Sequence, residues 1–460
     1  MSVTQAAVLA AGAGKKCWPY TDTRPKALLP VANRALIDRL LSQLREVGVE
    51  SVVVATAPGE NGDALRRHLA REVDVTCVTV EPTGTAAALE GCLPALDDTR
   101  PILVAYGDIV THGSNIDALL STGQRDDVVR CLVDGFPDDE PRGWIAAETS
   151  GEQLDRLVGG ARSGSRRLSG LFVLGPSFRE FVKGAPNPMR SVPVGGMPGR
   201  EAELASAVNA SIENGHDVGA VDAPEFHVDV DKPWHILVAN VAVVTERVGT
   251  LEDDEIHPSA SVHEGADIRG NAYLGPDATV GDRVVMDGNV WVEKGATVTN
   301  GAIIGGDCLI GRNASVTDHC HLGSRSVVGA DCRVGHAAEF GGVLFDGVAV
   351  VHYSQLSGII GERTDIGAAT VSGGLRFDDG KTVHDTNGFR EQPDVGANAV
   401  YLGDFSRTGV NVVLHPGVKL GAYSCVGPGA ILTDDVDSGT LVEVKQELVE
   451  HSWGPERYGW

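Results

Sequence analysis

The sequence has no long apolar run and little of the positive charge that nucleic-acid-binding proteins need. No segment approaches about 18 consecutive apolar residues, so nothing in it predicts a membrane span. Only 38 Lys and Arg stand against 63 Asp and Glu, which gives a formal net charge of −25. This balance argues against nucleic acid as a partner. A diffusely acidic surface keeps a protein soluble, and would also suit a high-salt cytoplasm, where charge is screened.

Export and metal-binding signals are also missing. The first residues, MSVTQAAVLAAGAG, lack the basic and long apolar segments of a signal peptide. The eight cysteines are scattered and contain no C-x2-C pair, although Cys308, Cys320 and Cys332 lie twelve residues apart with histidines nearby. We therefore expect reduced thiols, a cytoplasmic location and no membrane association.

Glycine, in contrast, is abundant, with 58 residues concentrated in the second half, where a six-residue repeat occurs. An apolar anchor returns at every sixth position without a slip: Ile256, Val262, Ile268, Leu274, Val280, Met286, Val292, Val298, Ile304, Ile310, Val316, Leu322, Val328, Val334 and Phe340. A small or modest residue follows four positions after each anchor. This pattern predicts a β-solenoid with three hexads per coil, anchors inward and glycine in the turns. The three cysteines share the slot of the alanines, which indicates small buried residues rather than zinc ligands.

The first half alternates short apolar strands with amphipathic helices. Residues 5–10, 51–56, 75–81 and 101–108 read as strands, and 35–48, 63–73 and 85–96 as helices. This order predicts a mostly parallel Rossmann-like α/β domain over 1–245. We expect a linker at 246–255, the solenoid at 256–442 and a C-terminal tail at 443–460. The six-residue rhythm breaks at 341–358 and 373–394, and we expect loops pushed out of the solenoid there.

Four segments of the α/β domain carry a family resemblance. They are LAAGAGKKCWPYTDTRPKALLPV (9–31), EPTGTAAAL (81–89), LVAYGDIV (103–110) and FHVDVDKPWHILVAN (226–240). In this order they resemble the landmarks of sugar-1-phosphate nucleotidyltransferases. Followed by a hexapeptide repeat, they resemble bifunctional enzymes that uridylylate N-acetylglucosamine-1-phosphate and acetylate glucosamine-1-phosphate. The resemblance implies that the solenoid is a left-handed parallel β-helix.

The resemblance implies transfer of a nucleotidyl group from UTP or dTTP to a hexose-1-phosphate, with release of pyrophosphate. Lys16 would meet the leaving phosphates and Lys26 the sugar phosphate or α-phosphate, while Asp108 and Asp229 would hold Mg²⁺. The implied nucleotide and sugar contacts are Leu9, Ala11, Gly12, Ala13, Gly14, Glu81, Gly84, Thr85, Gly107, Ser169 and Gly170.

The solenoid resembles an acetyltransferase that takes acetyl-CoA as a second substrate. VVHYSQLSGIIG (350–361) places His352 as the base that removes a proton from the sugar amine, work suited to a pKa near neutrality. The implied acetyl-CoA and acceptor contacts are Glu339, Ser354, Ala368, Ser406 and Lys419.

Several positions depart from the family pattern, so three interpretations stay open. Lys15-Lys16 replaces Thr-Arg, the stretch 159–172 lacks the usual Glu and Asn, and Gly341, Gln355 and Gly374 replace Lys, Tyr and Asn. The chain could be bifunctional in amino-sugar nucleotide synthesis, a glucose- or mannose-1-phosphate nucleotidyltransferase with a structural solenoid, or a non-catalytic regulatory relative. Because solenoid faces repeat and are partly apolar, we expect a homotrimer formed through the β-helix.

Overall fold

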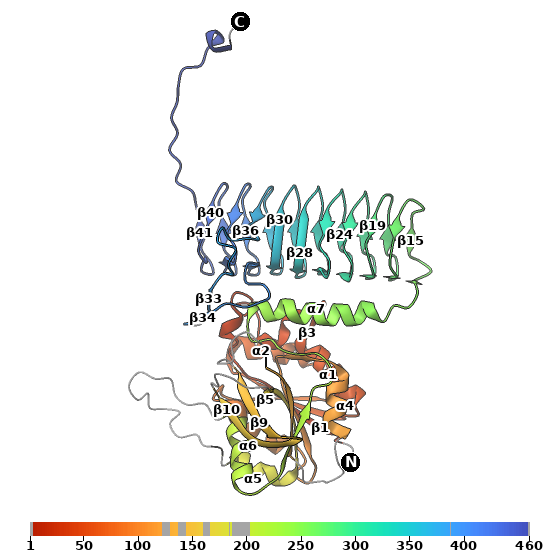
Figure 1. The fold of residues 1–460 in the computed structure, drawn as a ribbon, viewed down its shortest axis with the longest axis vertical. Coiled ribbons are helices and arrows are strands. Elements are labelled where there is room, and N and C mark those ends of the chain that lie inside the picture. Colours follow the sequence, from red (N-terminus) through yellow and green to blue (C-terminus); the bar gives the residue numbers. More distant parts are fainter. Residues whose placement is uncertain are drawn as a thin grey trace.

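The computed structural model of the protein describes residues 3–121, 129–136, 144–159, 166–183, 185, 203–386 and 388–458. Figure 1 shows an α/β domain below a straight β-helix, with the long helix α7 (Pro233–Gly249) running between them. Within those ranges, no helix combines the length and apolar character needed to cross a membrane.

The α/β domain is built on a nine-stranded sheet in the order β5-β4-β1-β6-β11-β8-β12-β10-β9. Its first four strands are parallel, as the prediction of a mostly parallel sheet requires. The rest of the sheet is mixed, because β11 runs antiparallel to β6 and β8, and β10 runs antiparallel to β12 and β9. The strands are β1 (Gln5–Ala10), β4 (Ser51–Thr56), β5 (Val75–Thr79), β6 (Ile102–Tyr106), β8 (Val129–Gly135), β9 (Ile145–Ser150), β10 (Gln153–Gly159), β11 (Arg166–Leu174) and β12 (Val218–Asp222).

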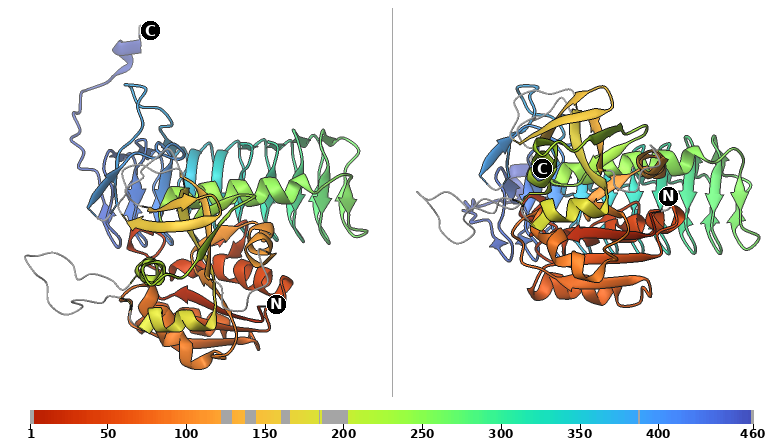
Figure 2. Two further views of the ribbon diagram at one scale, coloured as in Figure 1. Left: turned by 60° about the horizontal axis from the view of Figure 1, so that its bottom comes forward. Right: turned by 90° about the horizontal axis from the view of Figure 1, so that it is seen from below.

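Helices cover the sheet, and short elements surround its carboxyl end (Figure 2). The predicted helix at 35–48 is confirmed as α1, with Leu36, Leu40, Leu41 and Leu44 buried. The helices are α1 (Leu36–Glu46), α2 (Gly59–Leu69), α3 (Thr85–Cys92), α4 (Gly113–Ser121), α5 (Arg179–Lys183) and α6 (Leu204–Glu213), with short 3₁₀ turns η1 (Lys15–Cys17), η2 (Lys26–Leu28), η3 (Leu93–Ala95) and η5 (Pro176–Phe178). Two small antiparallel pairs complete the domain: β2 (Pro30–Val31) with β3 (Arg34–Ala35), and β7 (Ile109–Thr111) with β13 (His227–Asp229).

The second half is a parallel β-helix with three faces, as the hexad period predicts. Face A consists of β14 (Glu255–Ile256), β17 (Ala272–Leu274), β20 (Val290–Val292), β23 (Cys308–Ile310), β26 (Val327–Val328), β35 (Val400–Leu402) and β38 (Lys419–Leu420). Face B consists of β15 (Ser261–Val262), β18 (Thr279–Val280), β21 (Thr297–Val298), β24 (Ser315–Val316), β27 (Arg333–Val334), β29 (Ala349–Val350), β31 (Asp365–Ile366), β36 (Arg407–Thr408), β39 (Cys425–Val426) and β41 (Leu441–Val442). Face C consists of β16 (Asp267–Ile268), β19 (Val285–Met286), β22 (Ile303–Ile304), β25 (His321–Leu322), β32 (Val371–Ser372), β37 (Val413–Leu414) and β40 (Ile431–Leu432).

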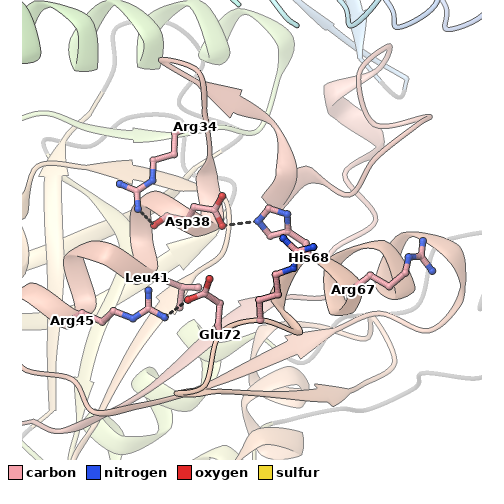
Figure 3. A pocket seen from close by; sticks show the side chains of 8 residues that line it. Arg34, Asp38, Leu41, Arg45, Arg67, His68 and Glu72 are labelled. Atoms are coloured by element: carbon pink, nitrogen blue, oxygen red, sulfur yellow. Dashed lines mark hydrogen bonds and ion pairs between the residues drawn. The ribbon is translucent and has the colours of Figure 1, made fainter. Parts of the chain in front are cut away.

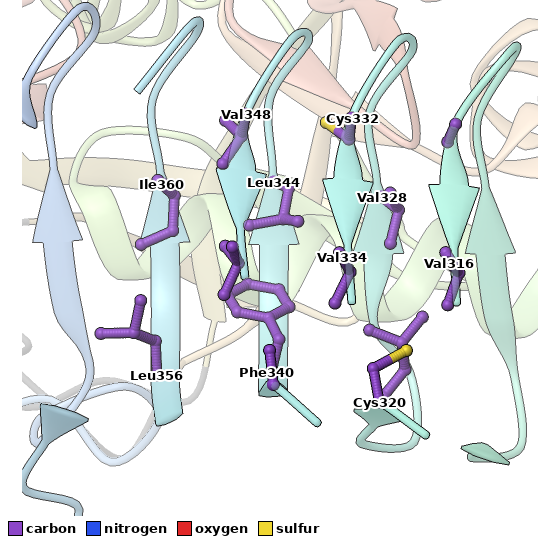
Figure 4. Packing of buried hydrophobic residues seen from close by; sticks show 14 of the residues in the cluster. Val316, Cys320, Val328, Cys332, Val334, Phe340, Leu344, Val348, Leu356 and Ile360 are labelled. Atoms are coloured by element: carbon purple, nitrogen blue, oxygen red, sulfur yellow. The ribbon is translucent and has the colours of Figure 1, made fainter. Parts of the chain in front are cut away.

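The anchors fill the interior of the β-helix (Figure 4). From Leu274 to Phe340 every anchor is at most 1% exposed, and only the first coil, with Ile256 and Val262, leaves its anchors uncovered. Cys308, Cys320 and Cys332 lie in the same core, at 0–1% exposure, and are free thiols. The interpretation of the cysteines as small core residues is therefore confirmed.

The two breaks in the rhythm have different structures. At the first, β28 (Glu339–Leu344) and β30 (Gln355–Ile360) each run from face C into face A without a corner, which shortens the coil from 18 residues to 16. The expected loop at 341–358 is therefore wrong. At the second, a hairpin of β33 (His384–Thr386) and β34 (Phe389–Glu391) leaves the β-helix toward the α/β domain, as expected for an excursion (Figure 1).

Face A is covered by the α/β domain of the same chain. Its outward side chains Leu309, Val327 and Val343 are buried in one cluster with residues of α7. Tyr20 Oη also donates to the carbonyl of Ile359 at 2.9 Å. Helix α7 continues to Gly249, so the first four of the ten residues in the predicted linker at 246–255 are helical. The tail after β41 extends away from both domains and ends in the 3₁₀ turn η6 (Pro455–Tyr458) (Figure 1).

Candidate functional site

The glycine loop after β1 forms one wall of the candidate nucleotide site. Gly14 adopts a left-handed φ of 65° and precedes η1, where the Cys17 N–H donates to the Gly14 carbonyl at 2.9 Å. Thr21 Oγ1 donates to the same carbonyl at 3.0 Å. Gly12 and Ala13 are exposed, and a Cβ at Gly12 would meet nothing within 4 Å. The loop therefore presents open backbone at the carboxyl end of the sheet, where a phosphate chain can approach.

Two lysines and two carboxylates form a connected cluster beside this loop. Lys26 Nζ lies 2.5 Å from Asp108 Oδ2 and 3.2 Å from Asp231 Oδ1. Lys16 Nζ lies 2.9 Å from Asp231 Oδ2. The structure thus brings together Lys16, Lys26 and Asp108 as predicted, and adds Asp231, which the sequence reasoning missed although it stands two residues after Asp229.

Asp229 joins this cluster through the pairing of β7 with β13. Asp229 is opposite Ile109, and the N–H of Val230 donates to the carbonyl of Asp108 at 2.9 Å. Burial, and next the negative charge of Asp108, raise the pKa of Asp229 to about 7. The two predicted magnesium ligands therefore lie on neighbouring strand ends and repel one another.

The lysines compensate this negative charge. Burial by itself would lower the pKa of Lys26. The negative charges of Asp108 and Asp231 raise it by more, so the pKa is well above the ordinary value. For Lys16, Asp231 likewise outweighs burial and raises the pKa. The pKa of Asp231 is lowered, because Lys26 and Lys16 overcome the effect of its burial. Both lysines consequently stay charged at neutral pH and can hold phosphate oxygens.

The donor set fits a magnesium ion only if the substrate completes it. No group of three or more His, Cys, Asp or Glu in the described part of the chain is arranged to hold a metal. Magnesium commonly binds one or two carboxylates together with substrate phosphates and water. Asp108 and Asp229 are such a pair, so they could hold Mg²⁺ when a triphosphate is present.

Other predicted contact residues lie at the same end of the sheet, and they differ in exposure and in whether their side chains are already hydrogen-bonded. Thr85 Oγ1, at the start of α3, donates to Glu203 at 2.7 Å and accepts from the Leu204 N–H at 2.7 Å, so its hydroxyl is occupied in joining α3 to α6. Glu81 is exposed, and Gly84 has a positive φ of 119°. Leu9, Ala11 and Gly107 are buried, and the Gly107 N–H donates to the Leu9 carbonyl. Leu9, Ala11 and Gly107 thus lie at the carboxyl ends of β1 and β6, where the glycine loop begins.

Ser169 and Gly170 lie on β11, beside β6. The Ser169 hydroxyl is buried and has no hydrogen-bond partner within the described ranges. Gly170 has a φ of 68°, and a Cβ there would approach the Tyr106 ring to 2.7 Å. A buried hydroxyl without a partner in the described residues can serve a polar ligand such as a sugar.

The solenoid residues predicted for acetyl transfer are not brought together as a set. His352 and Ala368 line one cavity of about 510 Å³. Ser354 and Ser406 point into the coil, where their hydroxyls donate to the carbonyls of Val351 and Gly403 at 2.8 Å. Both hydroxyls already donate within the fold, and the predicted contacts of Ser354 and Ser406 with acetyl-CoA or the acceptor stay predictions.

Glu339 and Lys419 also lie away from this cavity. Glu339 is exposed on face C, 3.7 Å from His321. Lys419 is 3% exposed and pairs with Asp435 at 3.0 Å. The His352 cavity is instead lined by Ser315, Thr317, Asp318, Arg333, Val334, Gly335, His336, Val351, Asp365, Ile366, Gly367, Ala368 and Val410. Of these, Asp318 and His336 are polar residues that the sequence reasoning did not select.

A further surface hollow of about 590 Å³ lies between α1 and α2 and is rich in arginine (Figure 3). Arg45 there contacts Glu72 at 2.6 Å, and His68 contacts Asp38 at 2.6 Å. The hollow includes none of the predicted site residues. We do not assign it to the active site.

Comparison with known proteins shows what the α/β domain and the whole chain are similar to. Residues 6–170 match the MobA-like NTP transferase domain family. The chain is 24% identical over 450 residues to a "Bifunctional sugar-1-phosphate nucleotidylyltransferase/acetyltransferase" of Sulfurisphaera tokodaii, covering 96% of this chain and 100% of that protein. It is 26% identical over 458 residues to a "Bifunctional protein GlmU" of Methanococcus maripaludis, covering 96% and 98%.

Among solved structures, the chain is similar to an inositol-1-phosphate CTP transferase from T. maritima. The TM-score is 0.42 at 17% identity, over 51% of this chain and 92% of that one.

Proposed function

We propose that this chain, a MobA-like NTP transferase domain fused to a parallel β-helix, transfers a nucleotidyl group from a nucleoside triphosphate to a sugar-1-phosphate. The convergence of the glycine loop, Lys16, Lys26, Asp108 and Asp229 on one end of the sheet carries the proposal. N-acetylglucosamine-1-phosphate and UTP or dTTP are the first substrates to test, because the sequence motifs resemble enzymes of that specificity and one full-length relative is named for both nucleotidyl and acetyl transfer.

The reaction joins a sugar-phosphate oxygen to the α-phosphorus while the bond to pyrophosphate breaks. Negative charge builds on the phosphate oxygens, so catalysis rests on positioning and on nearby cations. Lys16 and Lys26 both contact Asp231, which holds their ammonium groups beside the loop. Incoming phosphates would compete with Asp231 for these lysines. Mg²⁺ held by Asp108 and Asp229 would neutralise further phosphate charge.

The test is a panel of UTP, dTTP, GTP and CTP against four hexose-1-phosphates, with pyrophosphate release measured in the presence of Mg²⁺. We expect activity with at least one pair and its loss in Asp108→Ala. Asp117→Ala is the matched control, since Asp117 is an exposed carboxylate on α4 of the same domain. If nucleotides raise the melting temperature but no pair reacts, the chain is a non-catalytic binder and the proposal fails.

The β-helix supports a second activity, transfer of an acetyl group from acetyl-CoA to glucosamine-1-phosphate. The observation that favours it is His352, which lines a cavity of about 510 Å³ on a different part of the molecule from the lysine cluster. Release of free thiol from acetyl-CoA, dependent on glucosamine-1-phosphate and lost in His352→Ala, tests this activity. If no thiol appears, the β-helix serves assembly alone, as in a glucose- or mannose-1-phosphate nucleotidyltransferase with a structural solenoid.

We propose a homotrimer formed through the β-helix. The α/β domain of the same chain already covers face A, so faces B and C are the surfaces that other copies could contact.

A further inference from the structure

His352 belongs to a ladder of residues that stack on one edge of the β-helix. Asn300, Asp318, His336 and His352 occupy the same corner, between faces B and C, in successive coils. Backbone hydrogen bonds between successive coils fix this order. The N–H of Ala337, next to His336, donates to the carbonyl of Asp318 at 2.8 Å, and the N–H of Tyr353, next to His352, donates to the carbonyl of His336 at 3.0 Å. This corner is opposite face A, so it faces away from the α/β domain.

The side chains of the ladder form a continuous chain of contacts. Asn300 Nδ2 donates to Asp318 Oδ1 at 2.9 Å. His336 Nε2 lies 3.3 Å from Asp318 Oδ2, and His336 Nδ1 lies 2.7 Å from His352 Nδ1. The next rung is Ala368, whose methyl group cannot make a polar contact. His352 is therefore the last polar residue of the ladder, and it lines the cavity.

These contacts favour one of the two ring nitrogens of His352 as the carrier of its proton. Hydrogen bonds from Asn300 lower the pKa of Asp318, which is therefore a carboxylate that can only accept. His336 Nε2 faces Asp318 Oδ2 at 3.3 Å, and a hydrogen on Nε2 makes this contact with the carboxylate favourable. A neutral His336 accepts at Nδ1, so His352 carries its hydrogen on Nδ1 and leaves the Nε2 lone pair free.

We propose that Asp318 and His336 are positioning residues that keep Nε2 of His352 unprotonated, ready to accept a proton from an amine bound in the cavity. This rests on the proposed acetyltransferase function. As the amine nitrogen attacks the thioester carbonyl, its proton moves to Nε2 of His352, an amide bond forms and the carbon–sulfur bond breaks. The same proton then passes to the leaving thiolate. While His352 is charged, its Nδ1–H donates to His336, and the negative charge of the Asp318 carboxylate on the far side of His336 stabilises the pair.

The chain offers a matched pair of variants. Asp318→Asn removes the carboxylate at the end of the ladder. Asp331→Asn removes a carboxylate from an equivalent stack at another corner, where Asp331 Oδ1 accepts from Asn313 at 3.2 Å. For Asp318→Asn we expect kcat for acetyl transfer to fall ~10- to 100-fold with little change in KM. The control should stay close to the unaltered protein.

A second pair tests the hydrogen bond itself. His336→Gln keeps an oxygen that can accept from Nδ1 of His352, whereas His336→Ala does not, so we expect the Gln variant to retain more activity. The pH profile of kcat should move in Asp318→Asn. The charged groups that share this cavity and corner are Arg333, Asp365 and His319, and all three are unchanged in these variants.

The closing experiment is ¹⁵N NMR of histidine-labelled full-length protein, which reports the tautomer of His352 without any turnover. We expect the Nδ1–H form in the unaltered protein and in Asp331→Asn, and the Nε2–H form to increase in Asp318→Asn. An Nε2–H form in the unaltered protein would overturn the inference. If the Nδ1–H form is found but no acetyl transfer occurs, the proposed acetyltransferase function fails while the assignment of the tautomer stands.

Discussion

Lys232, at the start of α7, forms a buried ion pair with Glu391, on the hairpin that leaves the β-helix. Their side chains are 4% and 10% exposed. Lys232 directly follows Asp231, which binds both lysines of the nucleotide site. The β-helix therefore reaches back to support the segment that carries the acidic residues of the other domain.

Glu391→Ala should destabilise the protein and reduce nucleotidyl transfer together. Removing one partner of a buried ion pair leaves an uncompensated charge, which costs about 3–5 kcal/mol. The measurements are the melting temperature and pyrophosphate release. The double variant Lys232→Met/Glu391→Leu should recover much of the stability, because neither charge remains. A stable Glu391→Ala protein with full activity would contradict this role of the hairpin.

Magnesium-dependent nucleotide binding should weaken as the pH falls below 7. The pKa of Asp229 is about 7, and only the deprotonated carboxylate binds a cation. Well below pH 7, each further unit should lower the magnesium affinity about tenfold. Calorimetry with Mg²⁺ and UTP at pH 6, 7 and 8 measures this, and Asp229→Asn should bind weakly at all three values. Equal affinity at pH 6 and 8 would show that Asp229 is not a ligand.

The contact between the hairpin and α7 should weaken in acid. His384 donates from Nε2 to the Ala397 carbonyl at 2.8 Å and packs on Trp234, with ring centroids 5.1 Å apart. Burial lowers the pKa of His384 to about 4, so the neutral ring is preferred in the folded protein. The contribution of neutral His384 to the free energy of unfolding is complete above about pH 6.5. It is lost as the pH falls toward 4, at about 1.4 kcal/mol per pH unit. Melting temperatures between pH 7.5 and 4.5 measure it.

The matched control for this pH effect is His384→Gln, which keeps a donor but has no ionisable ring. The variant should lose less stability between pH 7.5 and 4.5 than the unaltered protein. Parallel curves for the two proteins would mean that other groups cause the acid sensitivity.

Lysine substitutions on face C should dissociate the proposed trimer. Ile303 and Ile431 present apolar side chains on this face, with 39% and 65% exposure. Burying a lysine in a contact between copies carries a desolvation cost. We expect Ile303→Lys and Ile431→Lys to shift the sedimenting species from trimer to monomer, while Asp117→Lys on α4 does not. A monomeric unaltered protein, or a trimer that survives both changes, would contradict this arrangement.

Local patterns in the sequence determined most of the fold. The six-residue period requires anchors to face one interior, because a coil of three short strands has no other place to bury them, and Leu274 to Phe340 do so. The alternation of strand and helix, with glycine after the first strand, likewise determined the parallel start of the sheet. The predicted approach of Asp108 to Asp229 followed because both lie at strand ends that meet at one edge, through the pairing of β7 with β13.

Contacts between distant segments could only be decided by the tertiary structure. Nothing local shows that the outward apolar residues of face A are covered by α7 rather than by another copy, or that Glu391 meets Lys232 from 159 positions away. Asp318, His336 and His352 lie on one edge although their spacing in the sequence differs. His336 follows Asp318 by 18 positions, whereas His352 follows His336 by 16, because the coil there is two residues shorter. The period of the sequence shows which side chains are buried inside each coil. Which residues of other coils or of the other domain they contact depends on the path of the backbone in three dimensions.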